Sequence, residues 1–239
     1  MGSSRLPGKT MALVFNRMPL LECVVRRFRA AKSLDDVVVA TTVQSGDDPI
    51  ATWCNENAVP VFRGSEDNVL ERVKSAAEHN GADVIVQMGA DSAYLDYSLI
   101  DQLVERYCNG RFDYVCNDLR LTYPLGIYGH VVSVKKLIEL SQRNDLSDKD
   151  RSDVVRYFWE HPESYAIANI EAPPEFHCPQ LRLTIDYPED MEQARAVYTH
   201  FGNHLFTTSQ VLDLSRQKPA MFERTRDLLQ QSAPFLRAE

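Results

Sequence analysis

The sequence has no long apolar segment, no clustered cysteines and no excess of positive charge. No apolar stretch approaches the roughly 18 residues that a membrane-spanning helix needs. No signal-peptide core stands at the N-terminus, so we expect a cytoplasmic protein. The five cysteines are scattered and form no Cys-x-x-Cys pair, which argues against structural zinc and a disulfide framework. With a net charge of −8, the chain lacks the basic face that nonspecific nucleic-acid binding requires.

A hydrophobic fraction of 44% is enough for a full core, and the apolar pattern alternates between helical and extended spacing. This alternation predicts a doubly wound α/β domain over residues 1–204. The predicted helices cover 19–31, 48–57, 68–78, 99–107, 134–142 and 188–200, and the predicted strands cover 37–42, 59–62, 84–88, 113–117 and 131–134, with two more near 166 and 181. Residues 205–239 are predicted to form a helical appendage with helices over 207–214 and 221–231.

The N-terminal segment Gly-Ser-Ser-Arg-Leu-Pro-Gly-Lys has the composition of a phosphate-binding loop. Gly2 and Gly8 let backbone N–H groups approach an anion, and Ser3 and Ser4 add hydroxyls. Arg5 can bind phosphate oxygens in a bidentate manner, and Lys9 adds a point charge. The spacing fits neither the Walker pattern nor Gly-x-Gly-x-x-Gly. A Gly/Ser-rich terminus is often only a tail, but the Arg-Leu-Pro-Gly-Lys part argues against that interpretation.

This loop closely resembles the nucleotide-binding signature of the cytidylyltransferases. The resemblance is strongest to the spore-coat-polysaccharide type, which is related to the 3-deoxy-manno-octulosonate and acylneuraminate enzymes. It extends over most of residues 1–200 and includes the segments 63–70, 96–101, 169–174 and 181–190. The resemblance implies a Rossmann-like nucleotide-diphospho-sugar transferase fold with a mostly parallel sheet. It also implies a homodimer, with residues 122–161 as a candidate interface.

In such sheets the phosphate loop follows the first, usually central strand. Here the loop begins at the first residues, so we expect a sheet without that strand. Either the sequence starts late, or another segment repairs the sheet in a natural variant.

Two aspartates follow predicted strands at the edge where α/β sheets bind ligands. Asp91 follows the strand 84–88, and Asp186 follows the strand near 181. The resemblance places both on the family's metal-binding aspartates, so it implies an Mg²⁺ ion shared with triphosphate oxygens. Without the resemblance, a helix cap for Asp91 and a turn for Asp186 would be the simpler interpretation.

A second nucleotide-binding segment is predicted at Arg63, Gly64 and Ser65, which follow a short strand. Gly64 permits close backbone approach, and the polar neighbours are suited to contact the base edge or the ribose. The alternative is an ordinary loop in which Ser65 caps the next helix.

The acceptor side departs from the family pattern. Where relatives read Tyr-Pro-Asp-Gly-Leu-Asp-Val-Glu-Val, this chain reads Tyr-Pro-Leu-Gly-Ile-Tyr-Gly-His-Val from Tyr123 onward. Three acidic positions have therefore become Leu125, Tyr128 and His130. A family Glu-His-Val-Thr-Pro-Tyr segment has become residues 152–157, which contain Arg156. We expect Tyr123, Tyr128, His130 and Arg156 to contact the acceptor, with His130 and Arg156 able to pair with an acid group on it. A single histidine is nonetheless more often structural than functional.

The resemblance implies transfer of CMP from CTP to an acidic sugar, with release of pyrophosphate, in surface polysaccharide or glycan biosynthesis. Arg5 and Lys9 would stabilise the departing pyrophosphate, and Asp91 would act through the metal. Two alternatives stay open. One is a transferase that uses another nucleoside triphosphate, and the other is a nucleotide-binding or scaffold protein with weak or lost catalysis.

Overall fold

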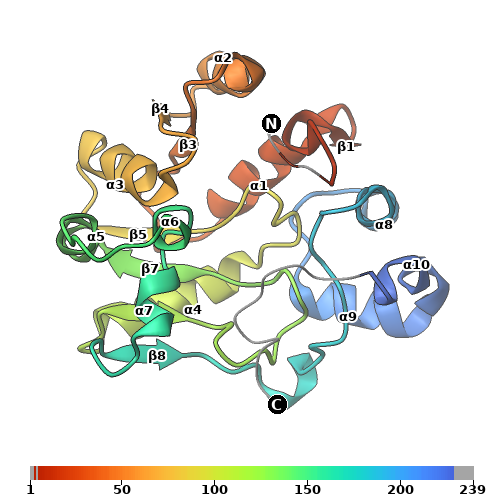
Figure 1. The fold of residues 1–239 in the computed structure, drawn as a ribbon. Coiled ribbons are helices and arrows are strands. Elements are labelled where there is room, and N and C mark those ends of the chain that lie inside the picture. The colour runs from red at the N-terminus through yellow and green to blue at the C-terminus, as the bar shows by residue number, and fades with distance from the viewer. Residues whose placement is uncertain (1–2, 4, 229–239) are drawn as a thin grey trace.

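The computed structural model describes residue 3 and residues 5–228, which form one α/β body (Figure 1). Its helices of eight or more residues lie close to the predicted ranges, because each has an apolar stripe at helical spacing. They are α1 (Leu20–Phe28), α2 (Asp48–Glu56), α3 (Val69–His79), α4 (Tyr97–Cys108), α5 (Val134–Ser141), α8 (Pro188–Phe201) and α9 (Thr208–Gln217). Shorter helices are α6 (Asp148–Arg151), α7 (Arg156–Glu160) and α10 (Glu223–Arg226). No helix within residues 5–228 is long and apolar enough to cross a membrane.

The described strands form three separate ladders. β3 (Val39–Thr42) pairs in parallel with β4 (Val61–Gly64). The largest ladder has the order β5-β7-β6-β8, formed by Val84–Gln87, His130–Ser133, Tyr114–Cys116 and Ile167–Asn169. A small antiparallel pair joins β1 (Leu13–Phe15) to β2 (Met18–Pro19). Among the described residues no ladder joins β3 to β5.

The expectation of a mostly parallel sheet holds for only part of the structure. β6 and β8 are parallel, but β7 runs antiparallel to both of its neighbours, so the main ladder is mixed. The reason lies in residues 117–129, which contain no helix and therefore cannot provide the usual crossover between parallel strands. The antiparallel direction brings His130, at the start of β7, beside Gln87, at the end of β5.

Two of the predicted elements differ from the structure. The strand expected near residue 181 is reduced to an isolated bridge between Leu125 and Arg182. The helix expected over 221–231 is reduced to α10, and the predicted positions from 229 onward lie outside the described residues.

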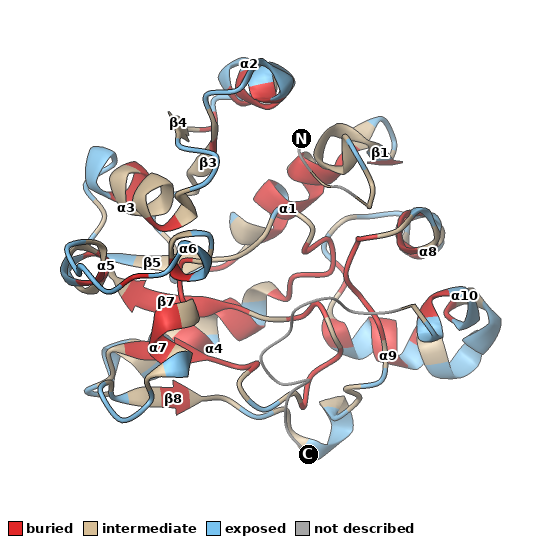
Figure 2. Cartoon of the chain, viewed as in Figure 1, coloured by how far each residue is buried: buried red, intermediate tan, exposed pale blue. Residues whose placement is uncertain are grey.

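The C-terminal segment shares the main hydrophobic core. Phe206, Val211, Leu214 and Phe222 belong to the same buried cluster as residues of α1, α4 and α8. The buried residues of α1, α8 and α9 are drawn in red in Figure 2. The division of the chain into a domain and an appendage stays a prediction, but the described part of the appendage packs directly on the domain.

Arg27 of α1 connects this segment to the core through a fully buried guanidinium. Its Nε donates to the carbonyl of Leu95 at 2.6 Å, and its two terminal nitrogens donate to the carbonyls of His204 at 2.6 Å and Phe206 at 2.7 Å. The guanidinium carbon lies 4.5 Å from the centroid of the Phe206 ring. A buried cation is stable only when its donors are used, and here three backbone oxygens use them.

Asp96 makes a second connection between the two parts. Its Oδ1 caps α4 by accepting from the backbone N–H of Ser98 at 3.0 Å, while its Oδ2 accepts from Thr208 N at 2.9 Å and Thr208 Oγ1 at 2.5 Å. Burial alone would raise the pKa of this carboxyl, but the hydrogen bonds from Ser98 and Thr208 outweigh burial and lower the pKa.

We expect Asp96 to make stability sensitive to acid. Its folded-state pKa lies below the unfolded value, so its contribution is present above about pH 4 and disappears as pH falls through the folded pKa. Asp96→Asn should lower the free energy of unfolding at pH 7 by about 1–3 kcal/mol and flatten its decline between about pH 5 and pH 3. Urea unfolding at several pH values measures both effects, with Asp35→Asn at an exposed position as the control. Identical pH profiles for wild type and Asp96→Asn would contradict the assignment.

Candidate active site

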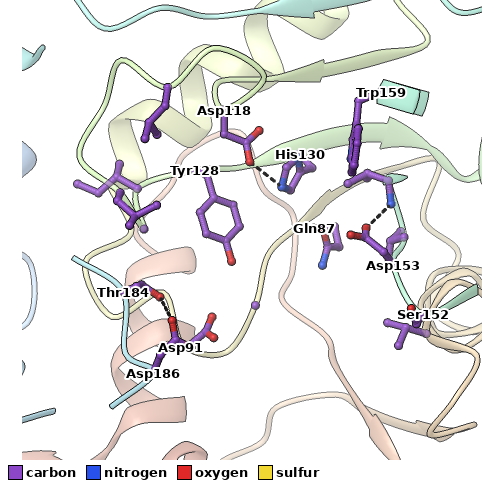
Figure 3. Close-up of a pocket in the computed structure, with 18 of the residues that line it drawn as sticks. Gln87, Asp91, Asp118, Tyr128, His130, Ser152, Asp153, Trp159, Thr184 and Asp186 are labelled. Carbon is purple, nitrogen blue, oxygen red and sulfur yellow. Dashed lines mark hydrogen bonds and ion pairs between the residues drawn. The ribbon is translucent and has the colours of Figure 1, made fainter. Parts of the chain in front are cut away.

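A cavity of about 360 Å³ opens at the edge of the main ladder (Figure 3). Gln87 ends β5, Asp118 follows β6, and His130 begins the antiparallel β7, so all three side chains reach the same edge. Asp91 and Asp186 line the opposite side of the cavity. This is the sheet edge at which open α/β folds bind ligands.

Lys9 joins the two aspartates that the sequence predicted as metal ligands. Its Nζ lies 2.8 Å from Asp91 Oδ2 and 3.2 Å from Asp186 Oδ1, and it donates to the carbonyl of Ile185 at 2.5 Å. These residues are 82 and 177 positions apart in the sequence, so only the fold brings them together. The predicted convergence of the loop and the two carboxylates is therefore present in the structure.

Arg5 lies beside the same carboxylate. Its Nη2 lies 2.8 Å from Asp186 Oδ1, and its guanidinium lies 5.3 Å from the ring centroid of Tyr187. Its Nη1 is buried and has no hydrogen-bond partner in the described part of the chain. A buried donor without a partner is costly, so Nη1 is a ready donor for a ligand oxygen in the cavity.

The segment that carries Asp186 is held in place by a close backbone contact. Gly126 has φ of 102°, and a Cβ at this position would lie 2.6 Å from backbone atoms of Leu183 and Thr184. Only glycine tolerates that combination of backbone angle and approach. On the other side, Arg182 donates to Asp186 Oδ2 at 3.2 Å and fixes the orientation of the carboxylate.

The far end of the cavity contains a chain of buried polar groups. His130 Nδ1 lies 2.5 Å from the hydroxyl of Tyr114, and its Nε2 lies 3.6 Å from Asp118 Oδ2. Burial raises the pKa of Tyr114 well above its usual range, so its phenol stays protonated and donates to Nδ1. Burial also raises the pKa of Asp118, and the charge of His130 opposes this only in part.

A third group of side chains lies beside Gln87. Asp153, Ser152 and Trp159 line this part of the cavity, and Tyr128 points its phenol toward Asp91 (Figure 3). The carboxylate of Asp153 accepts the backbone N–H groups of residues 155 and 156 through one oxygen, at 3.0 and 3.2 Å.

Several predicted site residues do not reach the cavity. Arg63 donates to the carbonyls of Thr42 and Gln44 and pairs with Asp48 at 2.7 Å, so it fixes the loop after β3. Gly64 ends β4 and Ser65 follows it, and neither lines the cavity. Ser65 Oγ accepts the N–H of Asn68 at 3.0 Å, but Asn68, and not Ser65, caps α3 by accepting the N–H of Glu71.

On the acceptor side, Tyr128 and His130 line the cavity as predicted, whereas Tyr123 and Arg156 do not. The ring of Tyr123 is buried in the main core. Arg156 lies over the ring of Trp159 and pairs with Glu160, so its charge is already balanced. The structure therefore gives these two side chains other partners outside the cavity, and their contact with an acceptor stays a prediction.

Of the remaining loop residues, Ser3 accepts the N–H of Leu6 at 3.2 Å, a local turn contact. The predicted roles of Gly2 and Ser4 fall outside the described residues.

The sequence did not lead us to predict Asp118 and Asp153 as site residues, although the position of Asp118 after a strand could have indicated it. Asp118 stands two residues after the strand Tyr114–Cys116, in the same relation to the sheet as Asp91. Asp153 lies in the segment that departs from the family pattern, and no local signal marks it.

The two aspartates beside Lys9 fit a magnesium ion chemically. Asp91 Oδ2 and Asp186 Oδ1 both reach one nitrogen, so they are close enough to share one cation. Mg²⁺ is commonly held by one or two carboxylates, with the remaining positions filled by water and phosphate oxygens. The described residues contain no group of three or more His, Cys, Asp or Glu side chains that could hold a metal alone. Such an ion would therefore depend on oxygens from a ligand.

A family model described as cytidylyltransferase matches residues 1–232. The chain is 36% identical over 234 residues to the spore coat polysaccharide biosynthesis protein SpsF of Bacillus subtilis, covering 95% of each protein. The chain belongs to the cytidylyltransferase family. The earlier resemblance is thereby confirmed, and the family assigns the protein to the nucleotidyltransferases.

Two solved structures share this fold. A cytidylyltransferase from Leptospira borgpetersenii superposes with a TM-score of 0.86 at 27% identity, over 97% of this chain and 95% of the other. A CMP:2-keto-3-deoxy-manno-octonic acid synthetase complexed with CTP gives a TM-score of 0.60 at 14% identity, over 84% and 95% of the two chains. These matches confirm the Rossmann-like α/β fold.

Proposed function

We propose that the protein transfers CMP from CTP to a hydroxyl of a sugar-like acceptor and releases pyrophosphate. The observation that carries this proposal is the contact of Lys9 with Asp91 and Asp186, the two aspartates that line the cavity. Membership of the cytidylyltransferase family supports CTP as the donor. The name of the Bacillus subtilis relative supports a place in polysaccharide biosynthesis. The homodimer stays a prediction.

In the proposed reaction the acceptor oxygen attacks the α-phosphorus and forms a new P–O bond. The bond from the α-phosphorus to the oxygen bridging to the β-phosphate breaks, pyrophosphate leaves with that oxygen, and the hydroxyl proton passes to solvent. Arg5 and Lys9 supply the positive charge that stabilises the triphosphate as charge develops on the leaving group. Asp91 and Asp186 would hold Mg²⁺, which when bound polarises the α-phosphate.

The donor side of the site gives little support to a catalytically inactive scaffold. Lys9 and Arg5 surround two carboxylates at a cavity, and Arg5 Nη1 has no described partner there. A scaffold has no need to keep these groups together at the cost of an unsatisfied donor.

Pyrophosphate release is the direct test. We expect release from the purified chain with CTP, Mg²⁺ and members of a panel of neutral, amino and acidic sugars, and none when the metal is chelated or the acceptor omitted. CTP should exceed ATP, GTP and UTP by at least about tenfold in kcat/KM. Equal rates with another nucleotide would contradict the choice of donor. Binding of CTP without release for any acceptor would favour the scaffold alternative.

A further inference from the structure

One of the two tryptophans of the chain, Trp159, lines the cavity. The other, Trp53, lies in α2 and packs against a separate apolar cluster. The indole of Trp159 is only partly buried, and in Figure 3 it lies at the same end of the cavity as Asp153, away from Asp91 and Asp186. A large aromatic surface is therefore available at the end of the cavity opposite the two aspartates proposed to hold the metal.

Helix α7 fixes the orientation of this indole. Arg156 stands three residues before Trp159, so the two side chains share one face of the helix. The guanidinium carbon lies 5.1 Å from the centroid of the indole, within the range of a cation–π contact. Arg156 is itself held by Glu160, and its Nε lies 3.9 Å from Asp150, while Phe158 of the same helix is fully buried in the core. An aromatic ring fixed in this way is preorganised, so binding on it costs little side-chain entropy.

A fixed aromatic face with polar neighbours is suited to a sugar ring. The face of an indole carries partial negative charge, so it attracts the weakly positive C–H groups that a pyranose presents on its flat sides. The hydroxyl groups of a pyranose point outward from its edge, and Gln87, Ser152 and Asp153 line the same end of the cavity as Trp159. Asp153 accepts the backbone N–H groups of residues 155 and 156 through Oδ1, so its Oδ2 can accept a hydrogen bond from a ligand hydroxyl.

Two other kinds of ligand would use the indole differently. An open-chain polyol has no flat C–H face, so Trp159 would add little to its binding. The cytosine of CTP could stack on an aromatic ring, as bases do in many proteins. The triphosphate, however, is assigned to Lys9, Asp91 and Asp186 on the opposite side of the cavity, and this position favours the acceptor as the ligand of Trp159.

We propose that Trp159 is the surface on which the acceptor packs, and that the acceptor is a cyclic sugar bound by one C–H face and not an open-chain polyol. This inference rests on the proposed nucleotidyl transfer and names an acceptor-binding residue of the same site. The selection is by the shape of the ring and not by charge, so it applies equally to neutral, amino and acidic sugars. Trp159 is then a determinant of acceptor specificity, and Arg156 is a positioning residue that acts through the indole.

Two substitutions of Trp159 separate its aromatic face from its bulk. With CTP, Mg²⁺ and a sugar that supports pyrophosphate release, Trp159→Leu should raise the KM for the sugar at least about tenfold and leave the KM for CTP unchanged. Trp159→Phe keeps an aromatic face and should stay within about threefold of wild type. Arg156→Gln should raise the KM for the sugar by about threefold without changing kcat or the KM for CTP. Trp53→Phe, at the tryptophan outside the cavity, is the control and should behave as wild type.

Tryptophan emission reads acceptor binding without turnover. In Trp53→Phe the single remaining tryptophan is Trp159, so its emission can be followed while each sugar is added with Mg²⁺ and a non-hydrolysable CTP analogue. The probes are glucose, N-acetylmannosamine and N-acetylneuraminate, each compared with its own reduced, open-chain form. We expect at least one cyclic sugar to change the emission and to bind at least about tenfold more tightly than its reduced form.

The binding measurement separates failure of this inference from failure of the proposed function. Preferred binding of a cyclic sugar supports the role of Trp159 even if no pyrophosphate is released, and then only the proposed function fails. Equal affinity for each sugar and its reduced form overturns the inference, as does an emission that no probe changes. An unchanged affinity for the sugar in Trp159→Leu, measured by calorimetry, also overturns it. If this variant instead binds the CTP analogue more weakly, the indole packs on the cytosine and the inference is wrong.

Discussion

Asp91→Asn is expected to lower kcat/KM for nucleotidyl transfer by about 100- to 1000-fold, the usual loss when one electrostatic contributor to a transition state is removed. The Asp91 carboxylate is 26% exposed and bonds to Lys9 at 2.8 Å. Asparagine keeps the shape but loses the negative charge that would hold Mg²⁺ beside the α-phosphate. Lys9 is only 12% exposed, but in the variant it keeps the Asp186 carboxylate at 3.2 Å as a partner, so the free energy of unfolding should change by less than about 1 kcal/mol.

The metal dependence separates this role from a general disturbance of the site. An amide oxygen is a weaker ligand than a carboxylate, so Asp91→Asn should require a higher Mg²⁺ concentration for half-maximal rate. Glu192→Gln, which alters an exposed pair with Arg224, is the matched control and should keep wild-type rate and metal dependence. If Asp91→Asn shows the wild-type metal dependence, Asp91 is not a metal ligand.

Arg182→Met should be the most destabilising of the changes considered, with a loss of about 3–5 kcal/mol in the free energy of unfolding. Arg182 is 2% exposed and donates to both carboxylate oxygens of Asp190, at 2.8 and 2.9 Å; Asp190 is fully buried. Without the guanidinium, the buried charge of Asp190 loses its cation, and the backbone N–H groups of Asp186 and Tyr187 compensate only in part.

Urea unfolding compares this variant with Arg224→Met. Arg224 pairs with Glu192 on the surface, where both side chains are more than half exposed, so its loss should cost less than about 1 kcal/mol. The slope of unfolding free energy against urea should stay constant in both variants, which shows that the same surface is exposed. Equal midpoints for the two variants would mean that the buried pair contributes no more than the exposed one.

The elements that the sequence predicted well are those with their own local signal. α1, α4 and α5 have apolar residues at helical spacing, and β5 is a short apolar run that places Asp91 at the binding edge. The placement of Lys9, Asp91 and Asp186 followed from a contiguous loop and two aspartates after predicted strands, whereas residues 63–65 do not line the cavity. The geometry of this donor side depends on contacts between residues far apart in the sequence. The resemblance to the cytidylyltransferase signature indicated which of these residues come together.

The acceptor side was predicted less well because nothing local distinguishes a cavity residue from a core residue there. Tyr123 and Tyr128 stand five positions apart in one loop, yet the first is buried in the core and the second lines the cavity. Arg156 is balanced by a glutamate one helical turn later, so its charge is unavailable to a ligand. Asp118 follows a strand in the sequence, but its contact with His130 depends on the antiparallel direction of β7.

Arg27 limits how far this protein can be shortened. A chain that ended at residue 204 would remove the carbonyl of Phe206 and the ring against which the guanidinium packs. A permanently charged group would then remain in the interior with donors unused, a state that proteins rarely tolerate. The segment after residue 204 thus supplies partners for Arg27 of α1, and we expect the smallest unit able to fold to extend beyond residues 1–204.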